Sequence, residues 1–355
     1  MSHGEDNSLK AVIVAVAVNA FIMVLKFVGW FLTWSPSLLA EAIHSVADVG
    51  NQFLLWVGIR QSQKAATPEH PYGWGTARYL WNLKSAMGIF FLGCGVTIAH
   101  GIHHAYEHFA HPAVRPALAP GQLDPEVVGL VILLVATLLE LYSWSVAFQE
   151  INAARGEMSL REYFAEGDDP TGVGVLLEDT AAVAGVLVAL TGLGLTKLTG
   201  SALFDIAATV VIGALLGWVA YVLARANGRL LIGAAVSKGE LAKIKAALED
   251  DEMVQRIVDL KTVVLGQGQV RVKCEVDLHE KLIANRIRDS LKADAARLGK
   301  GEEPMRVLVD VVGRSVRAAA GEIQRLDQKV REASPAAAHV DLELISKPEH
   351  GQDDG

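Results

Sequence analysis

The sequence predicts a polytopic α-helical membrane protein with six transmembrane helices, followed by a C-terminal cytoplasmic α+β domain. Three observations support this fold class. The chain has 355 residues, of which 51% are hydrophobic, and the apolar residues are concentrated in its first two thirds. That part contains apolar runs of about 20 residues, the length that crosses a bilayer core. The remaining third combines charged amphipathic helices with short alternating strands, as expected of a small soluble domain.

Six apolar segments are expected to cross the membrane, separated by connections rich in polar residues, Pro and Gly. The stretch "TWSPS" is expected to join the first two as a tight helical hairpin. The polar N-terminus and the lack of a small-residue cleavage pattern predict a retained first helix and not a cleaved signal peptide. The expected spans are residues 9 to 33, 37 to 60, 79 to 109, 124 to 150, 171 to 195 and 202 to 226.

Lys and Arg near the helix ends predict the orientation, because cytoplasmic connections carry an excess of positive residues. Both termini are therefore expected in the cytoplasm, and the membrane is expected to be a bacterial inner membrane. The expected cytoplasmic side carries Arg60, Lys64, Arg78, Arg155, Arg161, Arg225, Arg229 and Lys238, whereas the opposite side carries Arg115 and Lys197.

The domain after the membrane part, residues 236 to 347, is expected to follow the order α-β-β-α-β in a ferredoxin-like arrangement, with residues 1 to 235 forming the transmembrane domain. Two alternating strands, "VQRIVDLKTVVL" and "QVRVKCEVDL", flank a "GQG" turn, and "HVDLELI" is the last strand. An extra charged helix is expected as an insertion near residues 279 to 304. Residues 348 to 355 are expected to be a disordered tail.

Composition excludes several classes of function. A formal net charge of -8 argues against nucleic-acid binding, which requires a basic face. Cys94 lies in an apolar segment and Cys274 in the soluble part, so neither a disulfide framework nor redox chemistry is expected. No H-E-x-x-H or comparable pairing of metal ligands with a general base is present, so we expect neither an enzyme nor a bound cofactor.

His44 and Asp48 are the strongest candidates for a functional site. They lie in "EAIHSVADVGNQ" within the second span, where an ionisable side chain needs a partner, an aqueous cavity or a function. Their four-residue spacing aligns them on one face of the helix. An imidazole nitrogen and a carboxylate oxygen presented in this way form half of a four-coordinate divalent-metal site.

The other half of such a site is expected on the fifth span, in "VLLEDTAAVAGVLVAL". Glu178 and Asp179 are adjacent there, and adjacent residues point about 100° apart on a helix, so the two carboxylates are not expected to face one ion together. The sequence leaves open which of them faces it. Glu41, three positions before His44, is either a cap, an interfacial anchor or a further ligand.

Other polar groups in the spans are expected to stabilise the bundle. Lys26 is expected either to pair with an acidic group or to extend its amine toward the interface. Glu140 and Asp205 are expected to tie helices together, with a proton relay as the alternative for Glu140. Asn51 and Gln52 are expected to hydrogen-bond neighbouring helices. The five histidines of "HGIHHAYEHFAH" either capture metal or are solvated at the interface.

Taken together, these residues resemble the cation diffusion facilitator family of divalent-metal transporters. The resemblance rests on "NAFIMVLKFVGW" in the first span, "SPSLLAEAIHSVADVGNQ" in the second, "HPYGWG" at the start of the third, and the small α+β domain that follows six spans. The sequences "LAEAIHSVADVGNQ" and "LLEDTAAVAGVL" are most similar to the branch that includes zinc transporter 9.

The resemblance implies a transport site built from two residues of the second helix and two of the fifth, four positions apart in each. His44 and Asp48 fill the second-helix positions. Asp179 matches the second position of the fifth helix, whereas the first falls on Val175, which cannot bind metal. Water, or Glu178 after a local helix distortion, would complete the site. The expected metal ligands are therefore His44, Asp48, Asp179 and Glu178.

The family resemblance also implies the activity and the partners. The chain is expected to export a divalent cation from the cytoplasm by alternating access, in exchange for protons, and to form a homodimer through its cytoplasmic domain. Zinc is the expected ion, and Mn²⁺, Fe²⁺ and Co²⁺ also suit nitrogen and oxygen ligands. The alternative, motivated by Val175, is a metal-binding membrane sensor or scaffold that has lost transport.

Overall fold

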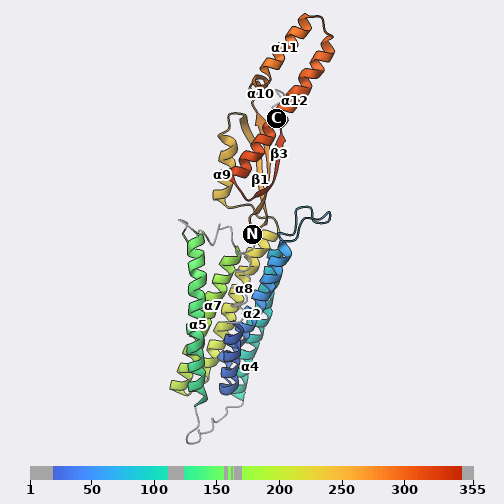
Figure 1. Cartoon of the computed structure of the whole chain (residues 1–355). Coiled ribbons are helices and arrows are strands. Elements are labelled where there is room, and N and C mark those ends of the chain that lie inside the picture. Colours follow the sequence, from blue (N-terminus) through green and yellow to red (C-terminus); the bar gives the residue numbers. More distant parts are fainter. Residues whose placement is uncertain (1–18, 111–123, 156–158, 161–162, 164–169, 346–355) are drawn as a thin grey trace, which may run out of the picture. The chain divides into compact units, whose positions relative to one another are not determined.

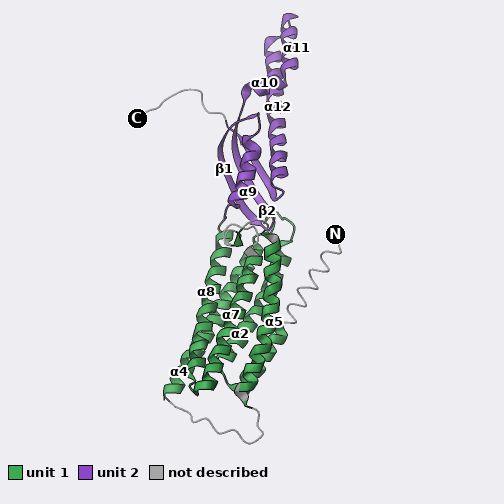
Figure 2. Cartoon of the chain, turned by 90° about the vertical axis from the view of Figure 1, so that its left-hand side faces the viewer, with its two compact units in different colours: residues 1–232 green, residues 233–355 purple. Residues whose placement is uncertain are grey.

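The chain divides into two compact units, Met1–Ile232 and Gly233–Gly355 (Figure 2). The computed structural model describes residues 19–110, 124–155, 159–160, 163 and 170–345. The expected disordered tail, residues 348 to 355, and the beginning of the first expected span lie outside the described residues.

The N-terminal unit is a bundle of long helices that run alongside one another (Figure 1). In the described part of the chain, four helical stretches are long and apolar enough to cross a membrane: Ala77–Ala110, Val127–Ala153, Gly172–Thr199 and Leu203–Leu231. The helix Asn19–Thr33 is apolar and shorter. The elements are the helix Asn19–Thr33, α2 (Pro36–Ser62), α3 (Ala77–Gly88), the π-helix η1 (Ile89–Val96), α4 (Thr97–Ala110), α5 (Pro125–Ala154), α7 (Pro170–Thr199) and α8 (Leu203–Leu231).

Local sequence explains the turn that leads into α2. Ser35 is its N-cap, and the Ser35 hydroxyl accepts a hydrogen bond from the Leu38 backbone N–H at 3.3 Å. Pro36 occupies the first helical position, where its missing N–H leaves no bond unmade. Trp34 takes a positive φ of 54°, which reverses the chain within two residues. The tight hairpin predicted from "TWSPS" is therefore present. It sets the residue at which α2 begins.

Close helix packing holds α7 against α8. A Cβ atom added to Gly192 of α7 would lie 2.5 Å from the Cβ atom of Ala208 and 3.0 Å from the carbonyl oxygen of Phe204, so a larger residue does not fit. Apolar side chains from α2, α3, η1, α5, α7 and α8 form the surrounding core, including Leu38, Leu133, Val186, Leu193, Ile212 and Leu216. This packing leaves little freedom in the positions of the polar residues on α2 and α7.

The C-terminal unit contains a mixed three-stranded sheet of order β1-β2-β3. Strand β1 (Val254–Gly266) pairs antiparallel with β2 (Gln269–Leu278), and β2 pairs parallel with β3 (Ala337–Leu344). Gly268 closes the hairpin between β1 and β2 with a φ of 64°, which glycine adopts readily. A ferredoxin-like domain has one more strand than the three that this unit shows among its described residues.

Four helices accompany the sheet in the described residues: α9 (Lys238–Glu249), α10 (Glu280–Arg286), α11 (Arg288–Gly299) and α12 (Pro304–Ala333). The charged segment near residues 279 to 304, expected as one inserted helix, is helical in the structure and is divided into α10 and α11. Ile287 lies between them with φ -104° and ψ 11°, outside the helical conformation.

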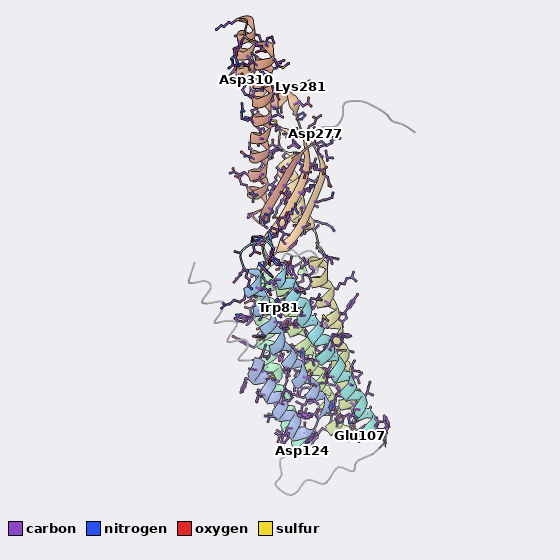
Figure 3. The ribbon with its side chains drawn as sticks, turned by 90° about the vertical axis from the view of Figure 1, so that its right-hand side faces the viewer. Trp81, Glu107, Asp124, Asp277, Lys281 and Asp310 are labelled. Atoms are coloured by element: carbon purple, nitrogen blue, oxygen red, sulfur yellow. The ribbon has the colours of Figure 1, made fainter. Side chains whose placement is uncertain are left out.

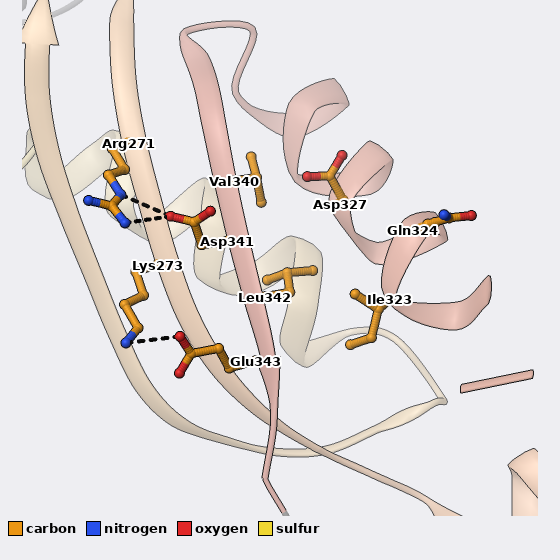
Figure 4. Close-up of a pocket in the computed structure, with 9 residues that line it drawn as sticks. All are labelled: Arg271, Lys273, Ile323, Gln324, Asp327, Val340, Asp341, Leu342 and Glu343. Atoms are coloured by element: carbon orange, nitrogen blue, oxygen red, sulfur yellow. Dashed lines mark hydrogen bonds and ion pairs between the residues drawn. The ribbon is translucent and has the colours of Figure 1, made fainter. Parts of the chain in front are cut away.

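Strand β2 supplies one wall of the core of this unit. Its side chains alternate between buried and partly exposed, and the buried ones are Val270, Val272, Cys274, Val276 and Leu278. They pack against Ile244 and Leu248 of α9 and Leu326 and Val330 of α12. On the other face, Arg271 pairs with Asp341 at 2.8 Å and Lys273 with Glu343 at 3.1 Å, which supports the parallel register of β3 (Figure 4). The period of two in the sequence therefore predicts the buried face correctly.

An ion pair with one buried carboxylate, that of Asp251, ties α12 to the end of α9. The Arg325 guanidinium donates two hydrogen bonds, both of 2.7 Å, to the Asp251 carboxylate, and the Lys329 amine donates a third at 2.9 Å. These bonds, with that from the Met253 backbone N–H, hold the pKa of Asp251 well below its usual range. A lowered pKa in the folded state contributes stability above the unfolded pKa of about 4, and this stability is lost as the pH falls below it.

We expect Asp251→Asn to destabilise this unit by about 2 kcal/mol at neutral pH, between the values for exposed and fully buried pairs. Hydrogen–deuterium exchange of the full chain should show faster exchange in α9 and α12, and the difference from wild type should shrink below pH about 4. Asp289→Asn is the control, because the Asp289 side chain is 96% exposed and pairs with Lys292 on the surface. Equal protection of wild type and Asp251→Asn at neutral pH would contradict the assignment.

Candidate functional site

His44 and Asp48 lie where the sequence predicts, on one face of α2. His44 Nε2 is 3.6 Å from Asp48 Oδ2. The His44 side chain is 3% exposed and that of Asp48 is 18% exposed, so the pair is largely shielded from solvent. Neither ring nitrogen of His44 has a hydrogen-bond partner. A buried imidazole with free nitrogens beside a carboxylate is a donor set that suits a divalent metal ion.

Glu178 and Asp179 on α7 point toward different neighbours. The Asn51 amide of α2 donates a hydrogen bond to Glu178 Oε2, and Asn51 in turn accepts one from the Ser85 hydroxyl of α3. Asp179 accepts a hydrogen bond of 3.3 Å from the Ser143 hydroxyl of α5. The divergence expected of adjacent helical residues is therefore present, with Glu178 directed to α2 and α3 and Asp179 to α5.

Both carboxylates of α7 are nevertheless close enough to Asp48 for their charges to act on it. In the part of the chain that the structure describes, no three His, Cys, Asp or Glu side chains converge on one metal position. The structure thus brings His44 and Asp48 together, with Asp179 and Glu178 nearby, and does not gather all four residues into one coordination shell.

A small cavity adjoins Glu178. It has a volume of about 10 Å³, close to that of one water molecule, and Val175 and Glu178 of α7 share its wall. Three amide side chains from other helices, Asn51, Asn82 and Asn227, complete the polar part of the lining. Asn82 of α3 donates a 3.1 Å hydrogen bond to Asn227 of α8. Amide side chains from α2, α3 and α8 therefore surround this cavity beside the Glu178 carboxylate of α7.

Lys26 lies at the centre of a second group of buried charges. Its amine donates hydrogen bonds to Glu41 Oε2 of α2 at 2.8 Å and to Glu140 Oε1 of α5 at 2.7 Å. Lys26 and Glu41 are fully buried, and Glu140 is 9% exposed. Of the two alternatives for Lys26, pairing with acidic groups is correct. Sequence reasoning did not predict that these three residues meet, although each stood out as an ionisable residue in an apolar helix.

The histidines of α4 lie toward one end of the bundle. Glu107 on this helix and Asp124 before α5 mark that end in Figure 3, and Trp81 of α3 lies toward the other. The rings of His100 and His104 are 4.4 Å apart between centroids, and those of His103 and His104 are 6.2 Å apart. His111 of the same motif lies outside the described residues.

Asp205 ties helices together, as the sequence suggests. Its carboxylate accepts hydrogen bonds from the hydroxyls of Ser35, at 2.6 Å, and Ser37. Both oxygens are satisfied by neutral donors at the start of α2, which identifies this buried carboxylate as a structural link between α8 and α2.

Neither cysteine nor the large surface hollow offers an alternative site. Both cysteines are free, and burial raises the pKa of the Cys274 thiol to about 12, which keeps it unreactive. The hollow at the edge of β3 has a volume of about 600 Å³. Its four charged groups on β2 and β3 pair with one another (Figure 4), and its Asp327 pairs with Arg331.

Comparison with known proteins places this bundle among transport proteins. A family model described as "Cation efflux transmembrane domain" matches residues 12–232. The chain is 33% identical over 352 residues to Metal tolerance protein C4 of Arabidopsis thaliana. This alignment covers 96% of this chain and 74% of that protein. It is 33% identical over 343 residues to the human Proton-coupled zinc antiporter SLC30A9, mitochondrial, covering 95% of this chain and 58% of the relative.

A shorter match, 32% identical over 100 residues and 28% of this chain, is to Magnetosome protein MamM of Paramagnetospirillum magneticum. The chain spans little more than half the length of the human relative. The region matched by the family model includes every helix that carries a candidate metal ligand.

Proposed function

This chain belongs to the cation efflux family of membrane transporters, and we propose that it exports zinc from the cytoplasm in exchange for protons. The family is one of transport proteins and not of enzymes, and the chain is a multi-pass membrane protein. The observation that carries the proposal is the buried pair His44 and Asp48 on α2, with two carboxylates of α7 within electrostatic range. Side chains of this kind inside a transmembrane bundle mark an ion pathway.

The proposed ligands are His44, Asp48 and Asp179, with Glu178 completing the shell. Zinc suits one imidazole and several carboxylates, and the human relative is named a proton-coupled zinc antiporter. Mn²⁺, Fe²⁺ and Co²⁺ accept the same donors. The ligand types therefore do not identify the transported ion, and competition between these ions and zinc for transport distinguishes them. Protons and metal compete for the same ligands, which supports exchange of one for the other.

We propose that all six expected spans cross the bilayer, including α2, whose polar residues lower its hydropathy. Each expected span coincides with a helix in its described part. The distribution of Lys and Arg supports cytoplasmic termini. The proposed location is a bacterial inner membrane, whereas the name of the human relative includes "mitochondrial".

We propose that the C-terminal unit is a ferredoxin-like cytoplasmic domain and that the chain forms a homodimer through it. An exposed apolar face on α12 supports this homodimer. Several large apolar side chains of its first half are more than half exposed, and such a continuous patch is typical of an interface. These residues are Met305 (65%), Leu308 (54%), Val309 (64%), Val312 (61%) and Val316 (63%).

The ligand assignment on α7 is tested by Asp179→Asn and Glu178→Gln in the full-length chain. Reconstituted in liposomes that contain a zinc-sensitive dye, wild type should give a zinc-dependent signal driven by a proton gradient. Asp179→Asn should lower zinc affinity and flux by about tenfold or more, and Glu178→Gln by less, because Asn51 already holds one of its oxygens. Glu150→Gln, an exposed carboxylate of α5, is the matched control.

The outcomes separate the alternatives. Zinc affinity unchanged in Glu178→Gln would remove Glu178 from the shell. Wild-type flux in Asp179→Asn would contradict the α7 assignment. Tight zinc binding without flux in the wild type would favour the sensor or scaffold, for which the apolar Val175 is the motivating feature.

A further inference from the structure

Three charged residues join the first helix, α2 and α5, and the proposed metal site gives no reason for their presence. They are Lys26, Glu41 and Glu140, here called the Lys26 cluster. One amine holds two carboxylates, with distances of 2.8 Å and 2.7 Å. The side chains of Lys26 and Glu41 are fully buried, and that of Glu140 is 10% exposed. An ion pair between two helices requires only one carboxylate for each amine. The second carboxylate therefore needs a separate explanation.

The charge of the cluster is unbalanced. Two carboxylates and one ammonium sum to one negative charge, and an uncompensated charge inside a transmembrane bundle is costly. Glu41 Oε1 is buried and has no hydrogen-bond partner. It faces Gly185 of α7, where an added Cβ atom would overlap it, so α7 leaves room for this oxygen. A proton on the cluster removes the excess charge without moving any helix.

The cluster is electrostatically connected to the proposed metal ligands. The Lys26 charge acts on His44 and Asp48, and the Glu140 charge acts on Asp48 and Asp179. Two helices contribute to both the Lys26 cluster and the proposed metal site. Helix α2 carries Glu41 three residues before His44, and α7 carries Gly185, which faces Glu41, six residues after Asp179. A divalent ion at the metal site therefore favours a negative cluster, and loss of the ion favours a neutral one.

We propose that the Lys26 cluster is a proton-binding site, distinct from the metal ligands, which is protonated when the metal site is empty and releases its proton when metal binds. A carboxylate of Glu41 or Glu140 takes up the proton from water on the side to which the bundle is open, forming a neutral carboxylic acid. On metal arrival the same bond breaks and the proton returns to water. This inference rests on the proposed function and identifies where one of the exchanged protons is held.

Charged and titratable groups approach the cluster from each helix packed around it. Because all of them share one electrostatic environment, the pH dependence belongs to the set and not to one residue. These groups are Lys26 from the first helix, Glu41, His44 and Asp48 from α2, Glu140 from α5, and Asp179 from α7.

The test is the number of protons released per zinc ion bound by the full-length purified chain, from calorimetry in buffers of different ionisation enthalpy. Glu41→Gln and Glu140→Gln keep the size of the side chain and cannot titrate. Each should release about one proton fewer per zinc than wild type, while zinc still binds. Asp205→Asn is the matched control, because it removes a buried carboxylate that neutral hydroxyls already satisfy, and it should match wild type.

A second measurement needs no variant. Infrared difference spectra of the wild-type chain should lose a protonated-carboxyl band when zinc is added, and the absence of this loss would overturn the proposal. Zinc binding with the same proton release in wild type and both glutamine variants would also overturn it, while leaving the proposed function intact. A wild-type chain that neither binds nor moves zinc would instead refute the proposed function.

Discussion

Zinc flux through the full-length chain is expected to fall about 100-fold when Asp48 is replaced by asparagine. Asparagine keeps the size of the side chain and removes the negative charge that lies 3.6 Å from His44 Nε2. A neutral amide is a far weaker ligand for a divalent ion than a carboxylate. The initial rate of the dye signal in liposomes, normalised to the amount of reconstituted protein, measures the effect.

Asp124→Asn is the control for this experiment. Asp124 is also a carboxylate of the bundle, and it pairs with Lys197 near the ends of α5 and α7, away from the proposed ligands. Its replacement should change the flux by less than about twofold, as expected for a partly exposed ion pair. A wild-type rate in Asp48→Asn would show that the cation does not pass through the polar face of α2.

Replacing Lys26 by methionine is expected to destabilise the bundle by about 3 to 5 kcal/mol. Methionine fits the space of the lysine stem, but Glu41 and Glu140 would then lose the amine that donates to both. A buried carboxylate without its partner costs more free energy than the packing that is lost with the lysine. Fluorescence-detected size-exclusion chromatography after heating should show a strongly lowered melting temperature or no monodisperse protein.

The triple variant Lys26→Met, Glu41→Gln, Glu140→Gln separates charge from packing. It keeps the methionine and neutralises both carboxylates, so its stability should recover most of the way to that of wild type. A triple variant as unstable as Lys26→Met alone would mean that the lysine stem, and not the charge balance, stabilises the bundle. A fully stable Lys26→Met variant would contradict the buried cluster itself.

The sequence predicted much of the fold because the signals are local. Apolar runs locate the helices of the N-terminal unit, and the period of two in "QVRVKCEVDL" identifies the buried face of β2, from Val270 to Leu278. The sequence was less informative where the local signal was weak. Residues 279 to 304 are charged throughout, so nothing in the pattern marked Ile287 as the break between α10 and α11.

The candidate site divides in the same way. The four-residue spacing of His44 and Asp48, and the burial cost of ionisable groups in an apolar helix, suffice to place this pair on one face of α2. The ambiguity between Glu178 and Asp179 could not be resolved from the sequence, because the direction of each depends on which helices surround α7. The structure directs Glu178 to Asn51 and Asp179 to Ser143.

The sequence by itself determined the membrane class, the helix positions and the polar pair on α2, since periodicity and hydropathy act within a few turns of one helix. Tertiary structure alone decided that Lys26, Glu41 and Glu140 meet, although Glu140 is 114 residues from Lys26 along the chain. Buried charges must find partners, but the sequence does not specify which helix supplies them. That choice follows from the packing of the first helix, α2 and α5, which brings the two carboxylates to one amine.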